Sequence, residues 1–245
     1  MICSACGHGQ RSETRDFNTN LQMQQETFER NVPEPDIRET RWPRRTAMIA
    51  SEIRRLARPG KALDIGCHTG IWLATLGEGW EKYGVEINRV AAPVARRFSQ
   101  AEVFCGPFES YDCGSVSFDL ITAFALIEHL SNPQVLVELA YEHLAPGGLL
   151  VLMTGDRESR VAQAMGSDWP LYWSPNHISF FSARSLCRLV QNYGFDVVRQ
   201  EWRFMYTSRG LASPILKSML KLKEILRINT SPIYDHYYCY ARKPV

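Results

Sequence analysis

Hydrophobic and polar positions along this chain follow two periods, one typical of buried strands and one typical of amphipathic helices. From residue 61 onward, short apolar runs alternate with stretches in which apolar residues recur every three or four positions. The runs predict strands, and the spaced stretches between them predict helices. The predicted strands are 61–65, 83–87, 103–105, 118–123 and 149–154, and the predicted helices are 72–80, 89–99 and 133–144. Apolar strands that alternate with helices indicate a parallel sheet covered on both faces.

The two ends of the chain differ from this middle part. Residues 1–36 are polar and close with Pro33 and Pro35, so they predict a poorly packed arm without a core of its own. A helical spacing begins at Arg44, and Pro59 ends it before the first strand. After the fifth strand we expect a long loop, a helix, a strand, an insertion and a last strand. Their ranges are 155–180, 183–192, 195–202, 204–233 and 237–241. We therefore predict one domain over residues 44–245 with an arm over residues 1–43.

Composition and charge narrow the class of protein. The 245 residues are 45% hydrophobic and 22% charged, which is ordinary for a globular protein and excludes collagen-like and low-complexity chains. A net charge of +2 gives no electrostatic reason to expect a nucleic-acid partner. The seven cysteines form no regular disulfide framework, and no signal peptide or long apolar segment is present. We expect a cytoplasmic protein that is neither exported nor membrane-spanning.

Candidate chemistry begins at the turn after the first predicted strand. Asp64, Gly66 and Gly70 lie where a strand ends and a helix opens, so free backbone N–H groups can receive a polar ligand there. Glycine allows a close approach of the backbone or a positive φ angle. Glu86 ends the second predicted strand, at the edge of the sheet where an acidic side chain can accept bonds from ribose hydroxyls.

Five ordered segments resemble the class I S-adenosylmethionine-dependent methyltransferases, in particular the small-molecule branch that contains the ubiquinone-pathway O-methyltransferases. The segments are Asp64-x-Gly66-x-His68-x-Gly70, Gly84-Val85-Glu86, residues 118–123 with Glu128-His129-Leu130, residues 144–152, and residues 177–182. The resemblance implies a doubly wound, Rossmann-like sheet of seven mostly parallel strands whose last strand is antiparallel. It also implies S-adenosylmethionine as the cofactor. The residues it assigns to that cofactor are Asp64, Gly66, Cys67, His68, Gly70, Glu86, Ile87, Phe108 and Ala123.

The sequence departs from the family at two points. His68 occupies the position of the central glycine, so its imidazole either points away or contacts the cofactor, or it crowds the cofactor and weakens binding. Residues 105–108 lack the acidic residue that many relatives use for adenine, which leaves backbone groups and Phe108 for that contact. One alternative is a nicotinamide oxidoreductase, although its GxGxxG pattern is not satisfied. Another is a binding module that has lost turnover.

Two histidines are candidates for acid–base chemistry. His177 lies between the fifth strand and the next helix, where it could serve as a base, contact the acceptor, or only bond a backbone carbonyl. His129 is adjacent to Glu128, so we predict that the two side chains point in different directions. The resemblance implies a substrate or metal contact at this turn; we favour a structural role for Glu128, and for His129 both interpretations stay open. The resemblance favours an oxygen of a phenol, quinone precursor or sugar as the methyl acceptor, with carbon and nitrogen left open.

Three further features remain as hypotheses. The aromatic residues around His177 suggest a lid or ordinary packing, and they are Trp169, Tyr172, Trp173, Phe180 and Phe181. Cys3 and Cys6 resemble one knuckle of a zinc ribbon whose second CxxC is missing, so we predict a degenerate remnant and no metal site. Residues 211–227 read as a basic amphipathic helix that either touches a lipid surface or packs on protein. The oligomeric state is left open.

Overall fold

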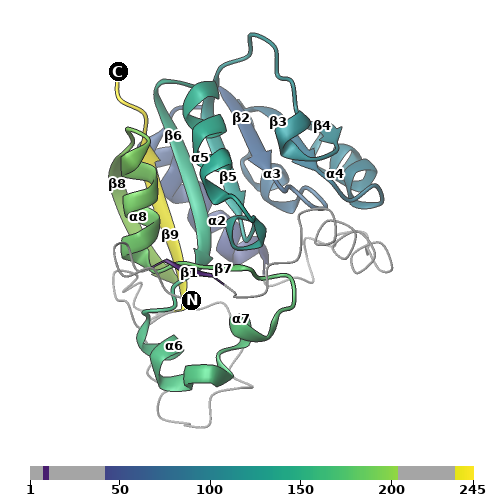
Figure 1. Cartoon of the computed structure of the whole chain (residues 1–245). Helices are drawn as coiled ribbons and strands as arrows, with labels where there is room; N and C mark the ends of the chain where they lie inside the picture. Colours follow the sequence, from purple (N-terminus) through teal and green to yellow (C-terminus); the bar gives the residue numbers. More distant parts are fainter. Residues whose placement is uncertain (1–7, 11–41, 204–234) are drawn as a thin grey trace.

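The fold is described here from a computed structural model, which places residues 8–10, 42–203 and 235–245. A seven-stranded sheet with flanking helices forms the body of the molecule (Figure 1). Its strands are β2 (Lys61–Ile65), β3 (Glu81–Glu86), β4 (Glu102–Cys105), β5 (Phe118–Phe124), β6 (Leu144–Gly155), β8 (Asp196–Arg203) and β9 (His236–Arg242). The main helices are α2 (Trp42–Leu56), α3 (Ile71–Thr75), α4 (Ala91–Ser99), α5 (Pro133–His143) and α8 (Ala183–Asn192).

The strand order is β4-β3-β2-β5-β6-β9-β8, and the chain winds outward in both directions from β2 and β5. The strands from β4 to β6 pair in parallel, whereas β9 runs antiparallel between β6 and β8. The predicted doubly wound sheet with an antiparallel last strand is confirmed. The order reverses between β2 and β5, and open sheets of this kind bind ligands beyond the carboxyl ends of the strands at that point.

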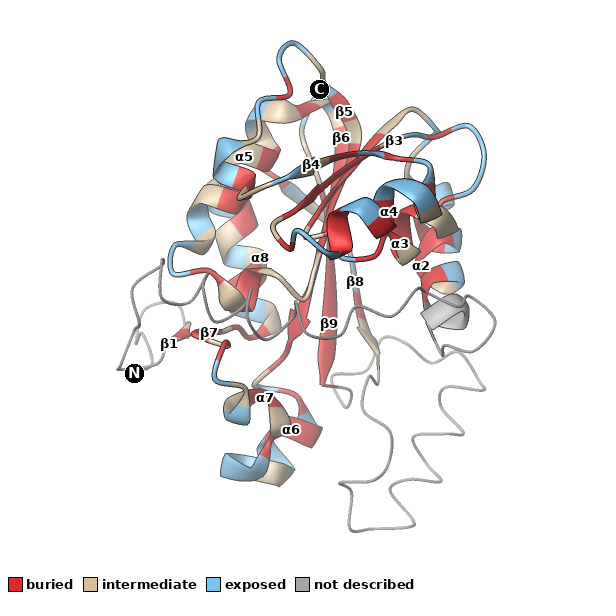
Figure 2. Cartoon of the chain, turned by 90° about the vertical axis from the view of Figure 1, so that its right-hand side faces the viewer, coloured by how far each residue is buried: buried red, intermediate tan, exposed pale blue. Residues whose placement is uncertain are grey.

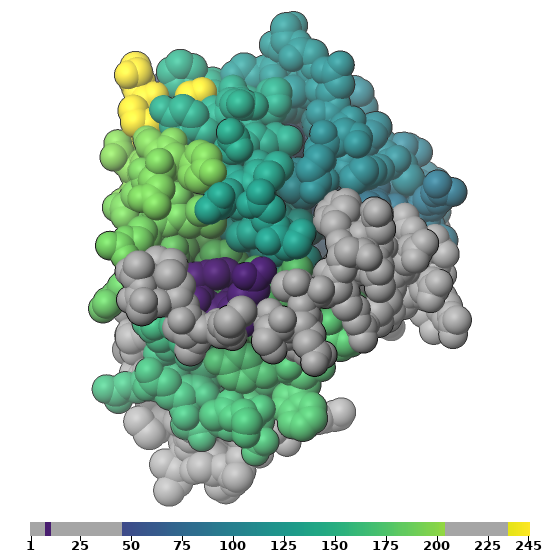
Figure 3. All heavy atoms as spheres, viewed as in Figure 1, coloured from purple at the N-terminus to yellow at the C-terminus, as the bar shows by residue number. Residues whose placement is uncertain are grey.

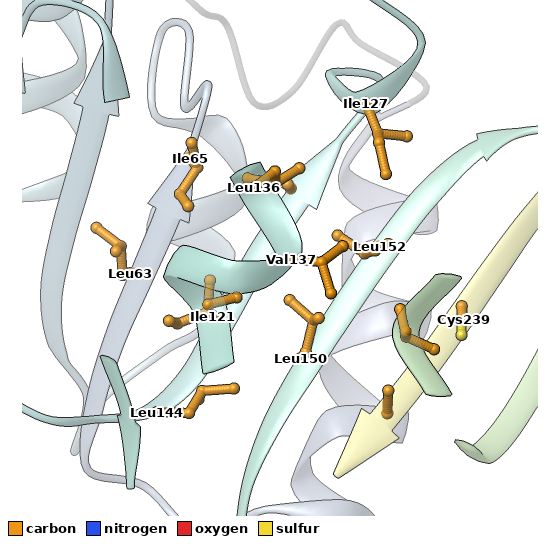
Figure 4. Close-up of a cluster of buried hydrophobic side chains, with 14 of the residues drawn as sticks. Leu63, Ile65, Ile121, Ile127, Leu136, Val137, Leu144, Leu150, Leu152 and Cys239 are labelled. Carbon is orange, nitrogen blue, oxygen red and sulfur yellow. The ribbon is translucent and has the colours of Figure 1, made fainter. Parts of the chain in front are cut away.

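Alternate side chains of each central strand enter two different cores, one on each face of the sheet. Leu150 and Leu152 of β6 pack under α5 and α8, whereas Val151 packs with α2, α3 and α4. Figure 4 shows the first core, with Leu136 and Val137 of α5 above the strands. Figure 2 shows the central strands buried along most of their length and helices buried along one side, whereas the edge strands β4 and β8 are partly exposed. Burial on both faces explains why the strands read as continuous apolar runs.

Two predicted elements differ in the structure. The third helix, expected over 72–80, ends at Thr75, because Gly77 and Gly79 take φ angles of 86° and 84° that break a helix. The loop expected over 155–180 contains α6 (Arg160–Met165), the 3₁₀ turn η3 (Gly166–Asp168), α7 (Pro170–Trp173) and the short strand β7 (Ser179–Phe180). The side chain of Ser159 accepts a hydrogen bond from Ala162 N and begins α6, a capping signal that the sequence analysis overlooked.

Part of the N-terminal arm is packed against the domain, contrary to the expectation that it has no core. The strand β1 (Gly9–Gln10) pairs antiparallel with β7, and the His8 ring lies 4.6 Å from that of Phe181. Figure 3 shows these arm residues in purple, seated among later parts of the chain. Cys3, Cys6 and the whole insertion over 204–233, with its predicted basic helix, lie outside the described residues. Among the described residues, no helix has the length and apolarity to cross a membrane.

Candidate functional site

The turn after β2 is built by hydrogen bonds to the neighbouring strand. The N–H groups of Gly66 and Cys67 both donate to Val85 O, at 2.8 and 3.1 Å. Gly66 and Gly70 have φ angles of 79° and 77°, which favour glycine. A Cβ on Gly70 would lie 3.0 Å from the Cα of Ala95 in α4, so the close approach at this glycine is to α4. The predicted glycine loop therefore forms at the carboxyl end of β2.

The side chain of Glu86, at the end of the adjacent strand β3, accepts hydrogen bonds that hold this turn in place. One carboxylate oxygen accepts a hydrogen bond from His68 N at 2.7 Å, and the other accepts one from Asn88 N at 2.8 Å. The side chain is buried, so these charge-assisted bonds offset the cost of removing the carboxylate from water. Each oxygen keeps a second lone pair, which is what acceptance of ribose hydroxyl bonds requires.

Asp64 lies near the end of β2, next to the same turn, where its side chain joins a buried series of hydrogen bonds. Thr122 Oγ donates to Asp64 Oδ1 at 2.6 Å, and Trp72 Nε1 donates to Thr122 Oγ at 2.9 Å. Burial raises the pKa of Asp64 to about 8, the Thr122 bond opposes this rise, and the Glu86 charge adds to it. Asp64 is therefore neutral near pH 7, and a positive charge beside it would favour its ionised form.

His68 takes a backbone conformation that glycine prefers. Its φ angle is 47°, a left-handed value uncommon for a residue with a Cβ, and its side chain is exposed. The imidazole therefore lies on the solvent side of the turn, and its relation to the cofactor remains a prediction.

Three other residues assigned to the cofactor face the protein interior. Cys67 packs beside Gly84, where a Cβ would lie 2.8 Å from Cys67 Sγ, and burial raises the pKa of the Cys67 thiol. Phe108 and Ala123 belong to the core under α5 and α8. The contacts of these three residues with a cofactor remain predictions. Ile87 is half-buried next to Glu86.

Two polar residues that were not predicted also support the site. Thr122 is a polar residue inside an apolar strand, and that contrast could have revealed it. Asn88 accepts hydrogen bonds from Val90 N and Ala91 N through Oδ1, at 2.8 and 3.0 Å, and so caps α4. An asparagine just before a predicted helix is a recognisable capping signal.

A second cluster lies beyond the carboxyl ends of β5 and β6. Glu128 and His129 belong to the 3₁₀ turn η2 (Ile127–His129), and His177 lies between α7 and β7. One potential ligand atom from each of the three side chains lies within 4.8 Å of the other two, so together they could hold a metal ion. The expectation that Glu128 and His129 point apart is wrong, because a 3₁₀ turn and the long Glu128 side chain let both groups reach the same space.

Hydrogen bonds between the two segments hold this cluster together. The N–H of Ile178 donates to Glu128 O at 3.0 Å, and Ser179 Oγ donates to Leu130 O at 3.1 Å. His129 Nδ1 lies 3.0 Å from Asn176 O. His177 Nδ1 lies 2.9 Å from Leu171 O, which is the carbonyl contact foreseen as the structural alternative. That bond fixes the orientation of the His177 ring.

Electrostatics in this cluster follow from burial. Burial raises the pKa of Glu128, and the facing His177 opposes the rise. Burial lowers the pKa of His129, and its bond to Asn176 O opposes the fall. Thr154 Oγ donates to Glu128 Oε2 at 2.9 Å. At neutral pH His129 is therefore an uncharged ring.

The aromatic residues around His177 divide into two groups. Tyr172 stacks edge-on with Trp169 and Phe180, with ring centroids 4.9 and 5.0 Å apart, and Phe181 is buried. These four rings pack the segment onto the domain. Trp173 is 70% exposed and is the one ring of the five that faces solvent.

The two clusters are neighbours in space. A Cβ on Gly66 would lie 3.5 Å from the side chain of Leu126, and Leu126 directly precedes η2. A glycine turn fastened by an acidic residue, at the switch point of a doubly wound sheet, defines a Rossmann-like fold for a nucleotide-type cofactor. Residues 38–200 match the family described as "Methyltransferase domain". The chain therefore belongs to that family of methyltransferase domains.

Named relatives agree with this assignment. The chain is 25% identical over 173 residues to a probable S-adenosylmethionine-dependent methyltransferase of Mycolicibacterium smegmatis, covering 70% of this chain and 65% of that protein. It is 28% identical over 143 residues to the ubiquinone biosynthesis O-methyltransferase of Idiomarina loihiensis, covering 53% of this chain and 59% of that protein. The matches thus span less than two thirds of the length of these relatives.

A solved structure shows the same fold. The N-methyltransferase NodS of Bradyrhizobium japonicum, in complex with S-adenosylhomocysteine, superposes with a TM-score of 0.61. The two sequences are 14% identical, and the match covers 92% of this chain and 100% of the NodS chain. The resemblance in fold and cofactor class is confirmed, and the methyl acceptor is left to the residues of the site.

Proposed function

We propose that this chain transfers the methyl group of S-adenosylmethionine to an oxygen of a small-molecule acceptor, which is a phenol, a quinone precursor or a sugar. The observation that carries the proposal is the convergence of Glu128, His129 and His177 beside the glycine turn. A hydroxyl that is to be methylated must lose its proton, and a carboxylate and two imidazoles are groups that can accept it. The ubiquinone biosynthesis relatives are O-methyltransferases by name, which supports the same acceptor atom.

In this proposal the turn after β2 holds the cofactor. Asp64, Gly66 and Gly70 shape the turn, the main chain at His68 lines it, and Glu86 accepts the ribose hydroxyls. Ile87 flanks the adenosine part, whereas Cys67, Phe108 and Ala123 contribute only backbone. Binding aligns the methyl group with the acceptor oxygen, and such alignment can lower the barrier by roughly 7–11 kcal/mol.

His177 and His129 are the candidate bases toward the acceptor. Each ring places Nδ1 on a backbone carbonyl, so the opposite nitrogen is the one that can take a proton. Glu128 stabilises the imidazolium that forms at His177, because the carboxylate faces that ring. The methyl group moves from the sulfonium to the acceptor oxygen, and the hydroxyl proton moves to the ring.

A binding experiment tests the cofactor. We expect S-adenosylmethionine and S-adenosylhomocysteine to stabilise the protein against thermal unfolding, whereas NAD and NADP do not. A ligand at 100 times its Kd stabilises by about 2.7 kcal/mol. Stabilisation by NAD alone would overturn the assignment of this site.

A turnover experiment tests the acceptor. Formation of S-adenosylhomocysteine is followed with a catechol, a monophenol and a sugar, each paired with an analogue in which an amine replaces the hydroxyl. We expect turnover with hydroxyl compounds only, and lower kcat in His177→Ala with unchanged affinity for S-adenosylhomocysteine. Methylation of the amine analogues would instead indicate a nitrogen acceptor, and cofactor binding without any turnover would indicate a binding module.

A further inference from the structure

Two cysteine side chains meet in the core between α8 and β9. Cys187 belongs to α8 and is half-buried, whereas Cys239 belongs to β9 and is fully buried. Figure 4 shows Cys239 on β9, in the core that α5 and α8 cover, and Cys187 packs against the same core. In the order of the sheet, β9 lies on the far side of β5 and β6 from β2 and β3, so this pair is separate from the glycine turn.

The register of β8 and β9 explains which side chains surround the two thiols. Tyr237 lies opposite Trp202, and Cys239 lies opposite Gln200. Residues directly opposite each other on two strands share a face of the sheet, and so do alternate residues of one strand. These four side chains therefore project from one face, the face that α8 covers. The thiol of Cys187 reaches this face from α8 and contacts the hydroxyl of Tyr237.

Hydrogen bonds in this corner can follow a change in the charge of Cys187. Its Sγ lies 2.9 Å from the oxygen of Tyr237, and either atom can be the donor. The Tyr237 hydroxyl donates to Gln200 Oε1 at 3.0 Å, so a protonated Cys187 donates to the tyrosine oxygen. When Cys187 is a thiolate, the tyrosine proton can turn to the sulfur. A hydrogen bond donated to the charged form favours that form.

The contact between the two thiols makes them unequal. The hydrogen bond with Cys239 lowers the pKa of the Cys187 thiol, burial opposes this fall, and the bond with Tyr237 adds to it. The same hydrogen bond, together with burial, raises the pKa of the Cys239 thiol. Cys187 is therefore the sulfur that ionises and that solvent can reach. A thiol of this kind beside a second thiol is the usual arrangement of oxidation-sensitive cysteines.

We propose that Cys187 and Cys239 form an oxidation site, at which hydrogen peroxide joins the two sulfur atoms in a disulfide bond. Cys187 is the sulfur that reacts with peroxide, and Cys239 is the sulfur that completes the bridge. This inference does not rest on the proposed methyl transfer, because both cysteines lie outside the cofactor turn and outside the cluster of Glu128, His129 and His177.

The reaction proceeds in two balanced steps. The Cys187 thiolate attacks one oxygen of hydrogen peroxide, the O–O bond breaks, and a sulfenic acid forms while hydroxide leaves and takes up the proton that the thiol released. The sulfur of Cys239 then attacks the sulfenic sulfur, the S–O bond breaks, and the second hydroxide leaves with the Cys239 proton. Two thiols are oxidised to one disulfide, and one peroxide is reduced to two molecules of water.

The bridge would change how α8 is attached to the sheet. The sulfur atoms of a disulfide are about 2.05 Å apart, closer than two hydrogen-bonded thiols, so oxidation draws α8 toward β9. It would also close a covalent loop that contains β8 and residues 204–233. A reductant opens the bridge again, since disulfide formation is reversible by thiol exchange.

The test treats the reduced full chain with a small excess of hydrogen peroxide near pH 7 and maps its peptides by mass spectrometry without reduction. We expect a Cys187–Cys239 bridge within one chain, which dithiothreitol removes. In Cys239→Ala the reaction should stop at the sulfenic acid of Cys187, which dimedone traps. In Tyr237→Phe, oxidation of Cys187 should be at least about threefold slower, because the thiolate loses a hydrogen bond.

Cys105→Ser is the matched control, because Cys105 is an exposed cysteine at the end of β4 and its loss should leave bridge formation unchanged. Circular dichroism of each variant verifies that it folds. The proposal fails if peroxide oxidises other cysteines of the parent protein without forming the Cys187–Cys239 bridge. It also fails if Cys187 forms a bridge only to a second chain, seen as a dimer on a nonreducing gel. Equal oxidation rates in Tyr237→Phe and the parent would overturn the part given to Tyr237.

Discussion

At the scale of single residues, the site depends on backbone groups that side chains hold in place. Glu86 bonds two N–H groups of neighbouring turns, and His68 has a φ angle of 47° at one of them. Such a conformation costs a residue with a Cβ about 1–2 kcal/mol. The bond from His68 N to Glu86 is what holds the turn in this conformation.

Replacement of His68 by glycine should relieve that cost. The imidazole is exposed, so little packing is lost, and we expect the free energy of unfolding to rise by about 0.5–1 kcal/mol in urea titrations. Gln100→Gly is the matched control, because Gln100 has a φ angle of 59° at the end of α4, away from the turn. We expect similar stabilisation from both, and a Kd for S-adenosylhomocysteine within about threefold of the parent. Much tighter binding in His68→Gly alone would show that the imidazole crowds the cofactor.

Replacement of Glu86 by glutamine should disorder the turn. The amide nitrogen would face a backbone N–H in place of a carboxylate oxygen, so one buried donor loses its acceptor. We expect a loss of about 2–3 kcal/mol in unfolding free energy and at least 10-fold weaker binding of S-adenosylhomocysteine. Glu142→Gln on the exposed side of α5 serves as control and should change neither quantity. Intact binding by Glu86→Gln would remove Glu86 from the site.

At the scale of elements, the segment from β6 to α8 shapes the acceptor side. It contains α6, η3, α7 and β7 where a loop was expected, and β1 of the arm pairs with its end. The helix α8 begins with a capping box, in which Ser182 Oγ accepts from Ser185 N at 3.2 Å and Ser185 Oγ accepts from Ser182 N at 2.8 Å. This cap fixes the end of the segment that carries His177.

Removal of the Ser182 cap should destabilise both α8 and the end of the segment that carries His177. Ser182→Ala leaves the N–H group of Ser185 without its acceptor, whereas Ser182 N can still donate to Ser185 Oγ. We expect a loss of about 1–2 kcal/mol in unfolding free energy. Faster amide exchange over residues 177–186, measured by mass spectrometry, should accompany it. Ser51→Ala on the exposed face of α2 is the control and should be neutral, since alanine favours a helix. Equal exchange in both variants would show that the cap does not stabilise the segment.

At the scale of the whole molecule, burial of charged groups links stability to pH. The pKa of Asp64 is raised to about 8 by burial, whereas in the unfolded chain it is near its usual 3.8. The native state therefore binds one more proton than the unfolded state between these values. The contribution of Asp64 to stability is complete at pH values below the unfolded pKa and is lost as pH rises through the folded pKa.

A comparison with Asp64→Asn isolates this effect. Asparagine keeps an oxygen that can accept the Thr122 bond but does not ionise. We expect the stability of the parent relative to this variant to fall by on the order of 1 kcal/mol per pH unit between pH 5 and 7.5, and to level off above about pH 8. Unfolding in urea at a series of pH values measures it. A difference independent of pH would mean that Asp64 ionises normally in the folded state.

The sequence by itself determined the elements of the central sheet and the cofactor turn. The strand at 61–65 and the helix at 183–192 were predicted with their observed bounds, because local periodicity and capping are sufficient for buried strands and for a helix such as α8. Asp64 and Glu86 stand near the ends of β2 and β3, and Gly66 and Gly70 lie in the turn from β2 to α3. The sequence could place them together because the ends of parallel strands meet at one edge, and their contacts with a cofactor remain a proposal.

Only the tertiary structure decided where side chains point. Periodicity could not show that Cys67, Phe108 and Ala123 face the core, since both faces of this sheet are buried. It could not place His177 beside Glu128 and His129, because that contact depends on how the segment after β6 folds back on η2. It also missed α6 and α7, whose short lengths give little periodic signal. Contacts between residues distant in sequence are fixed by packing of the whole chain, and local patterns do not record them.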